Sequence, residues 1–123
     1  MIVAIRPILL YPHQALKSRN TAVVPSDPAV QAVVQDMLDT LAASPGVALA
    51  APQIGYAVQV IAVDVSRKNG ETGHGLIVLL NPVILSLDGK KSVREGCLSV
   101  PDYTGNVLRY EEALVEGLAP DGR

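Results

Sequence analysis

One stretch of the sequence has the hydrophobic spacing of an amphipathic α-helix, and this pattern constrains the fold more than any other feature. Apolar side chains recur there at three- and four-residue steps, at Val30, Val33, Val34, Met37, Leu38 and Leu41. Ser26 or Asp27 can cap the start, and Pro28 suits the first turn. Residues 42–46 end the helix because they contain a proline and a glycine. We predict that this helix serves packing alone.

The other apolar runs are short and rich in β-branched residues, which is typical of strands. We predict strands at residues 56–65, 76–80, 83–87 and 107–118, a polar loop over 66–75, and a turn at Asp88-Gly89. Residues 1–25 contain three prolines and are predicted to form an irregular arm. The sequence shows no repeat and no low-complexity linker, so we predict a single domain over residues 1–123. The predicted class is α+β, with a mainly antiparallel sheet packed on the amphipathic helix.

Composition and charge exclude several classes of protein. Nearly half of the residues (49%) are apolar, but Phe and Trp are absent, so the core must be aliphatic. The formal net charge is only -2 with interspersed signs, which argues against nucleic acid as a direct partner. Arg6 and Pro7 interrupt the apolar start too early for a signal peptide or a membrane span, so we expect a cytoplasmic protein without membrane contact.

Two segments contain residues that could carry chemistry. In residues 46–55, small side chains lead to the lone amide of Gln53; they would permit strand addition by a peptide or tight helix–sheet packing, and neither is favoured. In residues 95–101, the only cysteine, Cys97, could bind a metal or attack a carbonyl, or be a buried and inert small side chain. The histidines, His13 and His74, are predicted to be polar turn or loop residues rather than metal ligands.

Taken together, these two segments resemble the motifs of the peptide deformylase family, Gly-Val-Ala-Leu-Ala-Ala-Pro-Gln followed by Glu-Gly-Cys-Leu-Ser-Val-Pro. Residues 7–12, Asn81-Pro82 and residues 103–107 also sit where the family has similar segments. The resemblance implies metal-dependent hydrolysis of the N-formyl group from the N-terminal methionine of nascent polypeptides. The implied metal is Fe²⁺, with Zn²⁺ and Ni²⁺ as alternatives. The implied partners are N-formylmethionyl peptides and, through nascent chains, the ribosome.

The resemblance also implies roles for individual residues. Cys97 matches the thiolate metal ligand, and Gln53 with the backbone N–H of Leu98 matches the pair that stabilises the oxyanion. The positions that match the substrate-aligning stretches are Gly46, Val47, Ala48 and Gly96. The family usually has glycine where this sequence has Ala48, and we expect the added methyl group to affect peptide binding.

The third motif of the family, a helical His-Glu-x-Asp-His, is absent from this sequence. In the family its two histidines complete the metal site and its glutamate handles the proton. A thiolate alone does not make a catalytic site, so we expect binding of the metal to be weak or absent and deformylation by this chain alone to be slight or absent. Residues 120–122 form a turn signal just before the last residue, so we expect a domain that is incomplete at its C-terminus, without the family's C-terminal helix.

Three hypotheses therefore stand side by side. The chain is part of a metal-dependent deformylase, or it is a non-catalytic deformylase-like domain that binds peptides. In the third, Cys97 is the nucleophile of a metal-free hydrolase, although no histidine near it in the sequence would activate the thiol.

Overall fold

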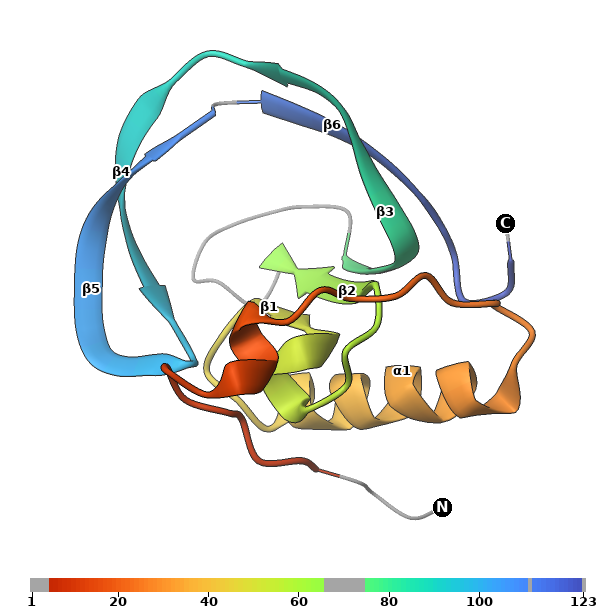
Figure 1. The fold of residues 1–123 in the computed structure, drawn as a ribbon. Helices are drawn as coiled ribbons and strands as arrows, with labels where there is room; N and C mark the ends of the chain where they lie inside the picture. Colours follow the sequence, from red (N-terminus) through yellow and green to blue (C-terminus); the bar gives the residue numbers. More distant parts are fainter. Residues whose placement is uncertain (1–4, 66–74, 111, 123) are drawn as a thin grey trace.

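A four-stranded antiparallel sheet with strand order β1-β2-β3-β6 forms the main layer of the fold (Figure 1). The computed structural model describes residues 5–65, 75–110 and 112–122. The strands of this sheet are β1 (Ala48–Ala50), β2 (Val60–Asp64), β3 (Leu76–Asp88) and β6 (Glu112–Leu118). The predicted class, α+β with a mainly antiparallel sheet packed on the amphipathic helix, is confirmed.

The only α-helix among the described residues, α1 (Pro28–Ala42), packs on one face of this sheet. Of the two predicted caps, Asp27 is the one that acts: its carboxylate accepts a hydrogen bond from the Ala29 N–H at 2.9 Å. The apolar side of α1 meets alternate residues of the strands, and Met37, Leu49, Val60 and Leu80 are the largest side chains that become fully buried. The resulting core is aliphatic, as the composition requires.

A second sheet of two strands, β4 (Lys91–Cys97) and β5 (Val100–Arg109), continues the chain out of β3 and back into β6. Together the four segments form one long antiparallel ribbon that arches away from the main sheet (Figure 1). The turn Leu98-Ser99 lies at the tip of the ribbon, and the arch returns this tip to the edge of the main sheet. We call residues 96–100 the tip.

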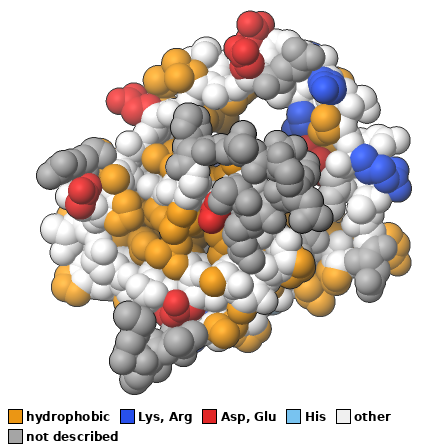
Figure 2. Space-filling view, turned by 180° about the vertical axis from the view of Figure 1, so that it is seen from behind, with side chains coloured by type: hydrophobic (Ala, Val, Ile, Leu, Met, Phe, Trp, Pro, Cys, Tyr) orange, Lys and Arg blue, Asp and Glu red, His pale blue; other side chains and the backbone are white. Residues whose placement is uncertain are grey.

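The middle of the ribbon leaves large apolar side chains exposed. Along β3 these include Val83, Ile84 and Leu85, which are 53–62% exposed. On the paired strand β6, Leu114 is 58% exposed and stands opposite Ser86. Figure 2 shows hydrophobic side chains gathered over the back of the molecule, with basic side chains confined to one side of that view. This part of the ribbon therefore contributes little to the core.

The strands differ from the sequence prediction in their limits. The predicted strands 76–80 and 83–87 are one strand, β3, and the predicted strand 107–118 is divided between β5 and β6. Within β3, Asn81 has a positive φ of 53°, and the register with β6 shifts between residues 80 and 83. The Asn81 side chain accepts a hydrogen bond from the Val23 N–H at 2.8 Å and donates one to the Val23 C=O at 2.9 Å. These two bonds attach the N-terminal arm to the sheet at the irregular position in β3.

The described part of the N-terminal arm, residues 5–25, is irregular, as predicted, apart from a short 3-10 helix, η1 (Gln14–Lys17). His13 caps η1, because its Nδ1 accepts from the Ala15 N–H at 3.0 Å, which agrees with the predicted role in a turn. His74 and most of the predicted loop 66–75 lie outside the described residues. The helices in the described part of the chain fall short of a membrane span in length and apolar content.

A polar cluster joins the start of the arm to α1. The Arg6 guanidinium lies 3.2 Å from the Asp36 carboxylate, and the Arg6 N–H donates to the Thr40 hydroxyl at 2.9 Å. The Tyr56 hydroxyl donates to the same Asp36 carboxylate at 2.7 Å, and this hydrogen bond raises the pKa of Tyr56 above its ordinary value of 10.0. Asp36 is a buried residue of α1. Through its carboxylate the helix holds the arm, by way of Arg6, and the segment before β2, by way of Tyr56.

Candidate functional site

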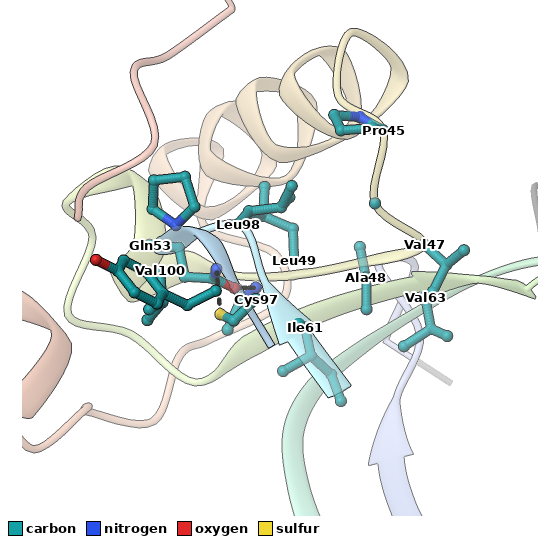
Figure 3. Close-up of a pocket in the computed structure, with 16 residues that line it drawn as sticks. Pro45, Val47, Ala48, Leu49, Gln53, Ile61, Val63, Cys97, Leu98 and Val100 are labelled. Carbon is teal, nitrogen blue, oxygen red and sulfur yellow. Dashed lines mark hydrogen bonds between the residues drawn. The ribbon is translucent and has the colours of Figure 1, made fainter. Parts of the chain in front are cut away.

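A groove of about 620 Å³ lies between the edge strand β1 and the tip of the ribbon (Figure 3). One wall is the stretch Pro45–Ala50, and the floor is the face of β2 that α1 does not cover. The opposite wall is formed by the tip, and Tyr103, which is 74% exposed, stands at the mouth. All seven residues proposed for the site from the sequence line or border this groove: Gly46, Val47, Ala48, Gln53, Gly96, Cys97 and Leu98.

Gln53 belongs to a short 3-10 helix, η2 (Ala51–Ile54), that follows β1 directly. Pro52 stands in its first turn, and Gly55 ends it with a left-handed φ of 94°, so the local sequence dictates this turn. The Gln53 Oε1 reaches back to accept from the Ala50 N–H at 2.9 Å. Because the carbonyl end of the amide is held in this way, its NH₂ group must point toward the tip.

The NH₂ group of Gln53 meets two side chains of the tip. Nε2 lies 3.2 Å from the Ser99 Oγ. It also lies 3.8 Å from the Cys97 Sγ, which stands beside it in Figure 3. The sulfur and the amide therefore converge in one groove although 44 residues separate them in the sequence. Cys97 is a free and exposed cysteine, so the alternative that its side chain is buried is wrong.

Leu98 packs its side chain against Gly46. A Cβ atom added at Gly46 would lie only 2.9 Å from Leu98 Cδ1 and 3.2 Å from Leu98 Cγ. Packing of the tip against the segment before β1 therefore favours glycine at position 46, because a larger residue would push the Leu98 side chain aside. The close packing at Gly46 is against the tip and not between helix and sheet, and strand addition by a peptide at this segment stays a prediction.

Among the described strands, β1 is the end strand of its sheet and pairs on one side only, with β2. Val47 C=O accepts from the Asp64 N–H of β2 at 2.7 Å, and Leu49 stands opposite Ala62. Because backbone groups of a strand alternate in direction, the N–H and C=O of Ala48 point away from β2 and toward the groove. An extended peptide could add to this edge.

The sequence analysis missed Ser99, which is buried and holds one side of the Gln53 amide. Its contact depends on the fold of the arch, and the signal in the sequence was its place in the motif Glu-Gly-Cys-Leu-Ser-Val-Pro, two residues after Cys97. Ile61 and Val63 also went unpredicted; they form the apolar floor because alternate side chains of β2 point away from α1 (Figure 3).

Cys97 is the only metal-ligating side chain among the residues that line the groove. Across the part of the chain that the structure describes, no group of three or more His, Cys, Asp or Glu side chains could hold a metal ion. The Gln53 NH₂ that faces the sulfur is a donor and not a ligand. The described residues therefore do not form a complete catalytic metal centre.

Comparison with known proteins identifies the family. The sequence profile of the polypeptide deformylases matches residues 5–123. This chain belongs to the polypeptide deformylase family. A peptide deformylase of Syntrophobacter fumaroxidans is 40% identical over 121 residues, which cover 98% of this chain and 70% of the relative.

Solved deformylase structures share the fold. That of the Legionella pneumophila peptide deformylase superposes with a TM-score of 0.88 at 38% identity, covering 98% of this chain and 69% of that one. The class I type b enzyme of Acinetobacter baumannii, bound to Met-Ala-Ser, has a TM-score of 0.88 at 27% identity, covering 99% of this chain and 81% of that one. The family is metal-dependent and acts on N-formylated nascent peptides.

Proposed function

We propose that the groove holds the N-formylmethionyl end of a new polypeptide, the substrate from which deformylases remove the formyl group. The observation that carries this proposal is the convergence of the Gln53 NH₂ group and the Cys97 sulfur, 3.8 Å apart, in a groove beside an open strand edge. The structure of the related Acinetobacter baumannii deformylase has Met-Ala-Ser bound, which supports a short peptide as the ligand of the groove.

In this proposal Gln53 and the backbone N–H of Leu98 donate to the formyl oxygen. That oxygen becomes anionic when the formyl carbon is attacked, so donors fixed beforehand stabilise the transition state more than the substrate. The loss of one such donor commonly raises the barrier by about 3 kcal/mol. The hydrogen bond from the Ala50 N–H to the Gln53 Oε1 fixes the amide, so its NH₂ group is directed into the groove before substrate binds.

The peptide backbone would pair with the outer edge of β1. Gly46, Val47 and Ala48 would align it from one side and Gly96 from the other, since both segments border the groove. The methyl group of Ala48 lies at this edge and would narrow the space for the substrate backbone. The apolar floor of Ile61 and Val63 suits an aliphatic side chain such as that of methionine.

Cys97 would be a ligand of the divalent metal on which the family depends, with Fe²⁺ as the first choice and Zn²⁺ or Ni²⁺ as alternatives. Because the described residues do not complete such a site, we expect this chain by itself to bind the metal weakly or not at all and to turn over little or no formyl peptide. This feature also supports the second candidate, a deformylase-like domain that binds peptides without catalysis. For either candidate we propose a cytoplasmic location and nascent chains on the ribosome as the source of the peptide.

Calorimetric titration of the chain with N-formyl-Met-Ala-Ser and with Met-Ala-Ser tests the proposal. We expect the formylated peptide to bind about tenfold more tightly, the ratio that one well-placed hydrogen bond to the formyl oxygen provides. Formate release and bound metal are measured on the same samples, with Fe²⁺, Zn²⁺ and Ni²⁺ added in turn.

The outcomes separate the alternatives. Absence of binding to either peptide would defeat both candidates, since both need the groove. Binding with formate release and near-stoichiometric metal would show that the chain is catalytic on its own, contrary to our expectation. Formate release that persists without metal and stops on alkylation of Cys97 would instead favour the metal-free hydrolase.

A further inference from the structure

We propose that the N-terminal arm acts as a strap that positions the Gln53 amide opposite the tip, through backbone hydrogen bonds from Leu9 and Tyr11. The strap is defined here as residues 9–11. The functional meaning of this inference rests on the proposed function, because Gln53 is the side chain that would touch the formyl group. Leu9 and Tyr11 themselves act at a distance, as positioning residues.

Two hydrogen bonds from the strap connect the two halves of the groove. The Leu9 N–H donates to the Gln53 C=O at 2.7 Å, and the Tyr11 N–H donates to the Ser99 C=O at 2.8 Å. Alternate amides of an extended chain point to the same side, so one short segment reaches both acceptors. Gln53 lies in η2 and Ser99 in the tip, 46 residues later, and the strap spans the gap between these elements (Figure 1).

The Gln53 side chain makes two further hydrogen bonds, which fix the orientation of its amide. With the backbone of Gln53 held by Leu9, its Oε1 accepts from the Ala50 N–H and its Nε2 donates to the Ser99 Oγ. The amide then has one N–H left, and this N–H faces the Cys97 sulfur in the groove. Ser99 is 4% exposed, so its hydroxyl cannot readily exchange this contact for water.

The strap is also anchored on both sides. Before it, the Arg6 N–H donates to the Thr40 hydroxyl at 2.9 Å, and the Arg6 guanidinium meets the Asp36 carboxylate at 3.2 Å. After it, the His13 N–H donates to the Leu10 C=O at 2.9 Å and begins the turn into η1. Movement of the arm would therefore be transmitted to both Gln53 and Ser99 through the two backbone hydrogen bonds of the strap.

The test is the rate at which the Gln53 side-chain amide protons exchange with water, measured by NMR without peptide. The Gln53 signal is assigned by its loss in Gln53→Glu. Leu9→Pro removes the N–H that donates to Gln53, and we expect its folded form to exchange about fivefold faster, the ratio for the loss of one ordinary hydrogen bond. Leu9→Ala keeps the N–H but loses the same side-chain packing, and its exchange should stay within about twofold of the parent.

Two further variants separate positioning from stability. Arg6→Ala removes the guanidinium contact with Asp36 and keeps the backbone N–H that donates to Thr40, so it weakens the anchor while leaving the strap sequence intact. We expect exchange about two- to threefold faster, whereas Arg19→Ala, farther along the arm, should change nothing. If Leu9→Pro does not fold, Arg6→Ala decides. Equal exchange in the parent and in every folded strap variant would overturn the inference, even where those variants unfold at lower temperature. Because no peptide is present, this result is independent of whether the groove binds N-formyl peptides.

Discussion

Gly46→Ala is the substitution that tests most directly how the tip packs on β1. The added Cβ would stand 2.9 Å from Leu98 Cδ1 and 3.2 Å from Leu98 Cγ, whereas carbon atoms prefer a separation of roughly 3.5–4.0 Å. Leu98 must therefore shift, and overpacking of this kind costs about 1–3 kcal/mol. The φ of Gly46 lies outside the left-handed region, so alanine also gains about 0.4–1 kcal/mol from a less flexible unfolded chain.

The net prediction is a loss of about 1 kcal/mol in the free energy of unfolding, measured by urea denaturation. In a Leu98→Ala background the clash is gone, so Gly46→Ala should become neutral or slightly stabilising. The coupling between the two substitutions should thus reach about 1 kcal/mol. Gly96→Ala is the matched control at the other wall, because its Cβ would meet Thr104 Cγ2 at an ordinary 3.5 Å.

The functional consequence follows from the same contact. A shift of the Leu98 side chain moves the tip that carries the proposed backbone donor, so Gly46→Ala should weaken binding of N-formyl-Met-Ala-Ser more than its effect on stability explains. The reasoning would be refuted by a Gly46→Ala protein as stable as the parent and additive with Leu98→Ala.

Two other substitutions test the links between the arm and the rest of the fold. Asn81→Gly keeps the positive φ but loses both hydrogen bonds to Val23, so we expect it to lower the free energy of unfolding by about 2 kcal/mol. Asn81→Ala loses the same bonds and also strains the backbone, which should lower the free energy of unfolding by about 1 kcal/mol more. Equal unfolding midpoints for the two variants would contradict this. Tyr56→Phe removes the bond to Asp36 and should cost about 1 kcal/mol. Because that bond raises the pKa of Tyr56, the stability that it contributes is complete below pH 10.0 and is lost as the pH rises through the raised pKa. The free energies of unfolding of the parent and of Tyr56→Phe should therefore become equal at alkaline pH. A difference that stays constant with pH would argue against the bond.

The sequence predicted those elements whose cause is local. The spacing of apolar residues and the Asp27-Pro28 start are sufficient for α1. The predicted turn at Asp88-Gly89 is wrong, because β3 runs on into β4 along the ribbon and pairs with β6 instead, although Gly89 has a positive φ of 68°. Strand β1 was not predicted because Ala-Leu-Ala has little preference for a strand and becomes one only by pairing with β2. Strand β4 was missed for a similar reason, since its mostly polar residues pair within an exposed ribbon.

The site shows the same division. The local sequence around Gln53 explains the turn of η2, but its distance from Cys97 depends on an arch of the chain that no short-range pattern encodes. Resemblance to a family suggested that the two side chains meet, and the folded chain brings them together. The contact of Ser99 with Gln53 could not be foreseen, because a serine two residues from a cysteine has many ordinary roles.

The most direct measurement of the central claim is the affinity of Gln53→Glu for formylated and unformylated peptide. This change keeps an oxygen for the Ala50 N–H but replaces the NH₂ group facing the groove with a second carboxylate oxygen. We predict that the preference reverses: the carboxylate repels the formyl oxygen of N-formyl-Met-Ala-Ser and attracts the free amino group of Met-Ala-Ser. A Gln53→Glu protein that is folded and retains the parent's preference for the formylated peptide would contradict the claim that this amide faces the formyl group.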